Sequence, residues 1–245
     1  MRCFIEPQHW STAEVELADE EAHHLRTVMR ARVGQTVGVF DGQGRTAEAE
    51  VFSLERHTAR VRVLQQNLEA RSALELVLIL GVPREQKMDL VVQKATELGV
   101  ARILPVRADH AVMQVRSDNE DSKRERWNRI ALNAAKQCGA AWLPTIAPAE
   151  DLETCLTTLA GPAALLLCSL DPDALPLRST LQSIRAAAPR AVAVLVGPEG
   201  DFSARERAVA RNAGARPVSL GPRTLRSETA ALYALSVLTY EFGAE

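Results

Sequence analysis

Two glycine-proline loops near the end of the chain hold the residues best suited to bind a ligand. The first reads GPEG, from Gly197 to Gly200, and the second starts at Gly221 and runs into a helical pattern. Gly197 and Gly200 allow the backbone to turn and to approach a ligand closely, while Pro198 stiffens the turn and removes one donor. The exposed amides and carbonyls could then hold a nucleoside, although each glycine could also serve only to make a turn.

The second loop also carries charge at positions where it could act on a substrate. Arg223 and Arg226 precede Ser227, Glu228 and Thr229, which enter the last expected helix. An arginine stays protonated and cannot be a base, but a fixed cation aimed at developing negative charge stabilises a transition state. We therefore expect Arg226 to stabilise or orient a substrate that becomes anionic. Glu228 could accept a proton or could equally pair with an arginine.

Both loops follow apolar runs, and this construction repeats through most of the chain. Apolar runs that stop at glycine and pass into helices are typical of buried parallel strands, and ligands bind at the carboxyl ends of such strands. The pattern predicts an α/β fold with a mainly parallel sheet and helices on both faces. The expected strands span residues 74–82, 101–106, 163–170, 191–197 and 216–221. The expected helices span 87–99, 117–139, 149–161, 177–188 and 227–242, with another beginning near 203.

Helix starts are marked by two S-x-x-E patterns, Ser117 to Glu120 and Ser203 to Glu206. In such a capping box, each of the two side chains bonds the backbone amide of the other residue. Asp201 lies just before the second box, and we expect it to cap the helix that begins near Ser203.

The first 71 residues lack this alternation and read as a small β-rich domain. A helix is expected over residues 20–31, with four apolar side chains on one face: Ala22, Leu25, Val28 and Met29. Strands flank a turn at Asp41-Gly42, and residues 58–66 alternate as a half-buried strand does. Several short strands predict a small barrel. The polar stretch 65–75 predicts a linker, so the expected domains are 1–71 and 72–245.

Composition and missing motifs exclude several classes of protein. The net charge of −2 and pI near 6.3 argue against a general nucleic-acid coat, but not against a local binding patch. No apolar run reaches the ~18–20 residues of a membrane span, and MRCFIEPQHW lacks the apolar core of a signal peptide, so we expect a cytoplasmic protein. The first strand–helix junction has no G-x-G-x-x-G, and no P-loop occurs. Cys3, Cys138, Cys155 and Cys168 form no CxxC motif and are expected to be reduced thiols.

Basic residues gather at two places that could contact phosphates or other polar substrate groups. Arg84 and Lys87 follow the first strand of the larger domain. A cluster at the end of the first helix could equally be a solvated face; it contains Arg26, Arg30 and Arg32. We expect His23 and His24 to be structural, since no third ligand suggests a metal site.

The two loops together, GPEGDFS and LGPRTLRSETAAL, resemble the ribosomal RNA small subunit methyltransferase E family of SPOUT methyltransferases. Further similar stretches are KMDLVVQKATELGV at 87–100, RWNRIALNAAKQCG at 126–139 and HHLRTVMRARVGQ at 23–35, so the resemblance covers nearly the whole chain. It implies a SPOUT-type parallel sheet with a C-terminal trefoil knot, preceded by a small PUA-like β-barrel that binds RNA. The strand–helix pattern alone does not predict the knot, because knots are almost absent from folds.

The resemblance also implies a reaction, the transfer of a methyl group from S-adenosylmethionine to nitrogen 3 of a uridine in 16S ribosomal RNA. Leu220 and Leu225 would cover the adenine, Gly221 would leave room, and Leu167 and Cys168 would form a third wall. The other expected cofactor-binding residues are Gly197, Pro198, Glu199, Gly200, Arg223 and Thr229.

Nitrogen 3 of uracil carries a proton that must leave, so Arg226 and Glu228 are the expected catalytic residues. The expected RNA-binding residues are Arg26, Arg30, Arg32, Arg84 and Lys87. No metal is expected. The resemblance further implies a homodimer. An apolar face on the last helix suits a dimer interface or packing within one subunit; it contains Leu232, Leu235, Leu238 and Phe242.

Three positions depart from the pattern expected of the family. Asp201 stands where a third glycine is expected in many relatives, so its carboxylate could instead bind the sulfonium charge of the cofactor. Lys136 replaces an expected glutamate, and Ala140 replaces an arginine after Gly139. Three other functions stay open: a methyltransferase acting on transfer RNA, an RNA-binding protein without catalysis, and a nucleotide- or phosphate-binding protein that uses GPEG at a helix start.

Overall fold

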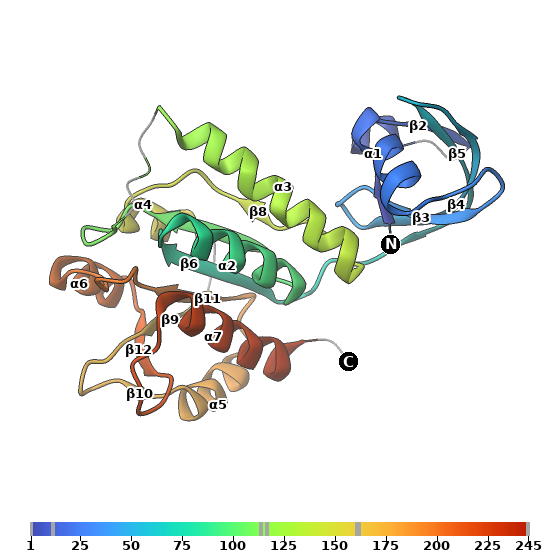
Figure 1. Cartoon of the computed structure of the whole chain (residues 1–245). Helices are drawn as coiled ribbons and strands as arrows, with labels where there is room; N and C mark the ends of the chain where they lie inside the picture. Colours follow the sequence, from blue (N-terminus) through green and yellow to red (C-terminus); the bar gives the residue numbers. More distant parts are fainter. Residues whose placement is uncertain (1, 11–12, 113–114, 116–117, 160–162, 244–245) are drawn as a thin grey trace. The chain divides into compact units, whose positions relative to one another are not determined.

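The computed structural model describes residues 2–10, 13–112, 115, 118–159 and 163–243 (Figure 1). The chain divides into two compact units: the first takes residues up to 71 and 132–143, and the second takes 72–131 and 144–245. Residues 132–143 thus belong to a different unit from the rest of the expected second domain. The expected linker also begins too early, because β5 (Ala59–Leu68) continues through the polar residues 65–68. This end of β5 is solvent-exposed, so it needs no apolar pattern.

A five-stranded sheet with the order β1-β3-β4-β5-β2 forms the first unit. Its remaining strands are β1 (Arg2–Phe4), β2 (Glu14–Leu17), β3 (Thr36–Phe40) and β4 (Arg45–Leu54). Strand β1 runs parallel to β3, and the other neighbours are antiparallel. Two register shifts bend β4. No pairing between β1 and β2 is present in the described residues, so the expected barrel is a curled sheet that hydrogen bonds do not close.

The helix expected over residues 20–31 is shorter and changes type. The helical turns of this unit are η1 (Pro7–His9), α1 (Asp19–His23) and the π-helical η2 (His24–Val28). Leu25 is buried, but Val28 is 55% exposed, so its predicted place on the apolar face is wrong. The amide of Met29 bonds the carbonyl of His24, and this wider turn rotates the later side chains away from α-helical positions.

Residues 132–143 are held inside the first unit by polar contacts. The ammonium of Lys136 pairs with the buried carboxylate of Glu21, whose Oε2 also accepts a hydrogen bond from the amide of Phe4 at 3.2 Å. Arg2 Nη1 donates to the carbonyl of Gly139 at 2.6 Å. Lys136, which departs from the family pattern, therefore has a structural partner in this chain.

The second unit is built on a parallel sheet with the order β10-β12-β9-β11-β6-β7-β8. Every neighbouring pair in it is parallel, as predicted. The expected strands are β6 (Glu75–Gly81), β7 (Arg102–Val106), β9 (Ala163–Cys168), β11 (Ala191–Val196) and β12 (Arg216–Ser219). Two short edge strands were not predicted, β8 (Thr145–Ile146) and β10 (Leu175–Pro176).

Both faces of this sheet are buried, which explains why its central strands are continuous apolar runs. In β6, Leu76, Leu78 and Leu80 belong to one core cluster, whereas Val77 and Ile79 belong to another. The first cluster is covered by α2 (Glu85–Glu97), α5 (Leu177–Ala187), α7 (Ser227–Phe242) and part of α3 (Glu120–Cys138). The second is covered by α4 (Leu152–Thr157) and α6 (Ala204–Asn212).

The starts of α5, α6 and α7 agree with the sequence, whereas α2 begins two residues earlier and α4 three residues later than expected. The capping box of Ser203 and Glu206 is present, with both reciprocal hydrogen bonds. Ser117, the start of the other expected box, lies outside the described residues, and α4 is shorter than expected. Among the described helices, none combines the length and the apolar character that a membrane-spanning segment requires.

Candidate active site

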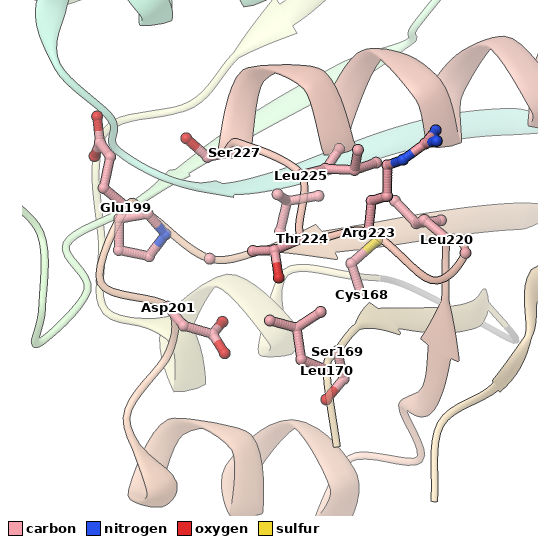
Figure 2. A pocket seen from close by; sticks show the side chains of 15 residues that line it. Cys168, Ser169, Leu170, Glu199, Asp201, Leu220, Arg223, Thr224, Leu225 and Ser227 are labelled. Carbon is pink, nitrogen blue, oxygen red and sulfur yellow. The ribbon is translucent and has the colours of Figure 1, made fainter. Parts of the chain in front are cut away.

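A pocket lies at the carboxyl ends of β9, β11 and β12, where the loops that follow these strands meet (Figure 2). Because β9 lies between β11 and β12 in the sheet, all three loops reach the same edge. The pocket holds about 650 Å³ of empty space, open solvent at its mouth included. It is lined by Cys168, Ser169, Leu170, Val196, Gly197, Pro198, Glu199, Asp201, Leu220, Gly221, Arg223, Thr224, Leu225, Ser227 and Ala230.

Most of the residues expected to bind a cofactor line this pocket. Leu167, Gly200 and Thr229 do not; Leu167 is fully buried in the core. The lining residues that sequence reasoning did not assign to the site are Ser169, Leu170, Val196, Thr224, Ser227 and Ala230; for Asp201 it offered contact with the cofactor as the alternative to a helix cap. Most of them stand next to an assigned residue, so extending each predicted loop in both directions would have found them.

The glycines of the GPEG loop make room for the protein itself. A Cβ atom on Gly197 would lie 2.5 Å from Asp201 Oδ1 and 2.8 Å from the amide nitrogen of Phe202. A Cβ atom on Gly200 would lie 2.8 Å from the Cβ of His110. The small size of Gly197 therefore lets the loop fold on itself, and that of Gly200 lets the loop pack against His110; close approach of a ligand to these glycines stays a prediction.

Gly81, at the end of β6, has the same role and was not assigned one from the sequence. A Cβ atom there would lie 2.4 Å from Cδ of Pro198 and 2.7 Å from its nitrogen. Real Cβ atoms do not approach backbone atoms so closely. The end of β6 therefore accepts the GPEG loop only because residue 81 has no side chain.

Asp201 does not cap α6, contrary to the prediction. Ser203 is the N-cap residue, and its hydroxyl accepts a hydrogen bond from the amide of Glu206. Asp201 has a φ of 59°, a left-handed conformation that aspartate adopts more readily than most residues. Its Oδ1 accepts from the amide of Phe202 at 2.8 Å, and the side chain lines the pocket.

An ionic triad of Lys87, Glu199 and Glu228 joins three segments beside the pocket. The ammonium of Lys87 lies 3.1 Å from Glu199 Oε1 and 3.2 Å from Glu228 Oε2. Hydrogen bonds to these carboxylates, that of Glu199 foremost, raise the pKa of Lys87. Burial opposes ionisation of Glu199, but hydrogen bonds from its own amide and from Lys87 outweigh burial and lower its pKa. Lys87, which the sequence predicted to bind RNA, thus links the GPEG loop to the start of α7 in this structure.

The two expected catalytic residues lie beside the pocket and do not line it. Arg226 is the exposed N-cap residue of α7, and its carbonyl accepts the amide of Ala230 at 2.8 Å. Glu228 is mostly buried, with 13% of its side chain exposed, and it pairs with Lys87. The sequence left open whether Glu228 pairs with an arginine; its partner is this lysine.

Cys168 at the end of β9 has no means of acting as a nucleophile at neutral pH. Burial, with a smaller contribution from the Asp201 charge, raises the pKa of its thiol to about 12. The thiol is therefore protonated, and the side chain serves as a small apolar part of the wall.

None of the remaining expected RNA-binding residues lines this pocket. Arg84 is exposed, and its amide contacts Glu199 Oε1 at 3.4 Å. In the first unit, Arg26 donates to the carbonyl of Arg56 at 2.9 Å, while Arg30 and Arg32 are exposed.

Histidines of the first unit show no ligand geometry. His24 Nε2 is buried without a hydrogen-bond partner in the described part of the chain, and burial lowers the pKa of this side chain. Over the described ranges, no group of three His, Cys, Asp or Glu residues could hold a metal ion.

Comparison with known protein families gives two matches that together cover most of the chain. Residues 70–239 match the RNA methyltransferase domain, and residues 17–64 match the RNA methyltransferase PUA domain. The division into a β-rich first part and an α/β second part is thus shared with this family.

Relatives and solved structures agree with these matches. The ribosomal RNA small subunit methyltransferase E of Synechocystis is 30% identical over 96% of this chain and 76% of its own length. The Bacillus subtilis enzyme of the same name is 28% identical over 92% and 89%. The Neisseria gonorrhoeae enzyme of that name, solved with S-adenosylmethionine, superposes with a TM-score of 0.86 at 29% identity, covering 98% of this chain and 96% of that one.

A methyltransferase from Legionella pneumophila, also solved with S-adenosylmethionine, gives a TM-score of 0.85 at 28% identity, with coverage of 98% and 96%. Two similar structures thus hold the same methyl donor, S-adenosylmethionine, which is the cofactor of these enzymes. The family match spans both units, and the relatives cover nearly the whole chain. The chain therefore belongs to the ribosomal RNA small subunit methyltransferase E family.

Proposed function

We propose that this protein transfers a methyl group from S-adenosylmethionine to nitrogen 3 of a uridine in the 16S ribosomal RNA of the small subunit, in the cytoplasm. The observation that carries the proposal is the pocket that three loops close at the carboxyl ends of β9, β11 and β12. It occurs in a chain whose relatives are named for methylation of small-subunit ribosomal RNA.

The residues that line the pocket fit S-adenosylmethionine. Leu220 and Leu225 offer apolar surface for an adenine ring, and Thr224 and Ser227 offer hydroxyls for polar groups (Figure 2). When bound, the cofactor supplies an electrophilic methyl group on a positively charged sulfur. Gly221, with a φ of 122° and open space beside it, keeps the second loop clear of the ligand.

Arg226 and Glu228 have separate roles in this proposal. Arg226 is exposed at the start of α7, so its guanidinium can reach a carbonyl of a uracil that enters from solvent. It would stabilise the negative charge that develops as nitrogen 3 loses its proton. The ammonium of Lys87 lies 3.2 Å from Oε2 of Glu228. For Glu228 to accept the proton, this ion pair would have to loosen or break.

RNA binding is assigned to the first unit, which matches a PUA domain. Arg30 and Arg32 are exposed there and would bind phosphates, with Arg26 beside them. Arg84 would contact RNA near the pocket. The functional domains are proposed to be 1–71 and 72–245. The proposal includes the trefoil knot, which follows from membership of the family and not from the contacts of α7, although α7 does return from β12 onto β6 and β11.

A second copy of this chain is the proposed partner of a groove between α5 and α7. The groove is lined by Leu177, Arg178, Leu181, Gln182, Arg185, Ala186, Tyr233, Val237, Tyr240 and Glu241. Tyr240 is 90% exposed and Tyr233 47%, whereas Leu235 and Leu238, expected either at a dimer interface or packed within one subunit, are buried inside the subunit. The final helix therefore has a second apolar side that its own subunit leaves uncovered. Sedimentation of wild type and Tyr240→Glu tests the homodimer: wild type should have the mass of a dimer and Tyr240→Glu that of a monomer. A monomer mass for both proteins would exclude the homodimer.

Calorimetry and methylation assays test the function. S-adenosylmethionine should bind and ATP should not, whereas the reverse would favour a nucleotide- or phosphate-binding protein. Small ribosomal subunits, naked 16S ribosomal RNA and transfer RNA should then be compared as methyl acceptors, with mass spectrometry to locate the product. Methylation of transfer RNA alone would replace the proposed substrate, and cofactor binding without methylation of any RNA would leave an RNA-binding protein.

A further inference from the structure

Asp201 places a carboxylate in the wall of the pocket. Figure 2 shows the side chain turned inward from the GPEG loop, toward the side of the pocket that carries Leu170 and Ser169. Its Oδ1 is fixed by the amide of Phe202 at 2.8 Å. About half of the side chain is exposed, which leaves the carboxylate accessible to a ligand in the pocket.

The charge of Asp201 is only partly compensated. Its nearest cation is Arg207, whose Nη1 lies 3.6 Å from Oδ2, beyond hydrogen-bond length. The same Nη1 donates to the carbonyl of Phe202 at 2.5 Å, and Nε of Arg207 lies 3.8 Å from Asp171. Glu199, the other carboxylate of the lining, is held by Lys87 at 3.1 Å.

Arg223 is the remaining charged residue of the lining, and it does not neutralise the charge of Asp201 directly. In Figure 2 the guanidinium of Arg223 lies beside Leu225, on the opposite side of the view from Asp201. The negative charge of Asp201 is felt within the pocket, since it contributes, after burial, to the raised pKa of the Cys168 thiol. A cation that enters the pocket is therefore attracted by a carboxylate whose charge the protein neutralises only in part.

We propose that Asp201 is a specificity-determining residue that favours the cationic methyl donor over the neutral product of the reaction. This inference rests on the proposed function. During methyl transfer the bond between sulfur and the methyl carbon breaks, and its electron pair stays on sulfur, while nitrogen 3 of uracil binds the methyl group and releases its proton. The cofactor thus changes from a sulfonium to an uncharged thioether. A nearby carboxylate attracts the first and not the second, so it discriminates between them.

Calorimetry with two ligands tests this role without measuring activity. The dissociation constants of S-adenosylmethionine and S-adenosylhomocysteine are compared in wild type and Asp201→Asn. Asparagine tolerates the left-handed backbone and can still accept the amide of Phe202, so the change removes mainly the charge. We expect affinity for S-adenosylmethionine to fall about tenfold, ~1.4 kcal/mol, while affinity for S-adenosylhomocysteine changes much less. The two ligands share their amino and carboxyl groups, so those contributions cancel.

Asp173→Asn is the matched control. Asp173 lies on the loop after β9 and pairs with Arg211 at 2.7 Å, but it does not line the pocket. Its loss should leave the ratio of the two affinities unchanged. Equal weakening of both ligands in Asp201→Asn, or no weakening, would overturn the proposal while leaving the methyltransferase function intact. Failure of wild type to bind S-adenosylmethionine would instead remove the function and this inference together.

Discussion

The ammonium of Lys87 lies 3.2 Å from Oε2 of Glu228, which joins the start of α2 to the start of α7. The same ammonium holds Glu199 in the GPEG loop at 3.1 Å. None of the three side chains is more than about a quarter exposed, so water screens the triad only partly. One lysine therefore links Glu199 in the pocket wall to the start of α7 beside the pocket.

Lys87→Met should loosen the pocket, because two carboxylates would then lie close together without their cation. We expect a loss of about 1–2 kcal/mol in the free energy of unfolding and about tenfold weaker cofactor binding. Lys87→Arg keeps the charge and should recover part of both. Lys94→Met is the control, since Lys94 pairs with Glu97 on the same helix away from the pocket. Thermal unfolding and calorimetry measure the two effects; equal losses in both methionine variants would contradict a special role for Lys87.

The contribution of Lys87 should also depend on pH. The pKa of Glu199 is lowered on folding, so its stabilisation is present above its ordinary value of 4.5 and is lost as the pH falls through the folded value. The pKa of Lys87 is raised, so its stabilisation is present below 10.5 and is lost as the pH rises through the folded value. The stability difference between wild type and Lys87→Met should thus be constant near neutral pH and shrink as the pH falls through the folded pKa of Glu199, which lies below 4.5. Urea unfolding across this range measures it, and a difference that grows in acid would refute the ionic explanation.

Gly81→Ala should disturb the GPEG loop from a position outside the pocket. The added Cβ atom would lie 2.4 Å from Pro198 Cδ, so the loop must move. We expect about 1–3 kcal/mol of destabilisation and weaker binding of S-adenosylmethionine. Gly214→Asn provides a control, because residue 214 has open space around it and a left-handed backbone that asparagine tolerates. Normal cofactor affinity in Gly81→Ala would show that the loop accommodates the methyl group.

Arg30 and Arg32 should contribute to RNA binding through phosphates. Arg30→Gln and Arg32→Gln each remove one positive charge. Residue 30 has a φ of 51°, and the conformational cost of this φ should be the same for glutamine as for arginine. Each lost phosphate contact should reduce the slope of log affinity against log salt by about one, without altering cofactor affinity. Arg60→Gln is the comparison, since Arg60 already pairs with Glu16 at 3.1 Å. An unchanged slope would mean that these arginines form only a solvated face and do not contact RNA phosphates.

Arg226→Lys should slow methyl transfer more than it weakens cofactor binding. Lysine keeps the charge but loses the planar fork that can meet a carbonyl oxygen. We expect about a 10–100-fold lower rate, equivalent to ~1.4–2.7 kcal/mol. Higher pH should restore part of it, because more uridine is then already deprotonated. Single-turnover rates at saturating cofactor across a pH series measure this. Weaker cofactor binding with the wild-type pH profile would mean that Arg226 only shapes the loop.

The sequence by itself determined the α/β class, the parallel sheet and the position of the pocket. These depend on local patterns: apolar runs long enough to be buried on both faces, glycines at their ends, and the S-x-x-E box that starts α6. Since parallel strands present their carboxyl ends at one edge, the loops after β11 and β12 were expected at the same edge, and the strand order, with only β9 between them, brings them together.

Only the tertiary structure decided which residues meet at that edge. Lys87 pairs with carboxylates more than a hundred residues away in the chain, and Gly81 contacts Pro198 at a similar separation. No local pattern encodes such contacts, because they exist only once β6 lies beside β11 in the sheet. Asp201 is a similar case: the sequence left a helix cap and a contact with the cofactor both open, and in the structure Ser203 is the cap while the Asp201 carboxylate points into the pocket.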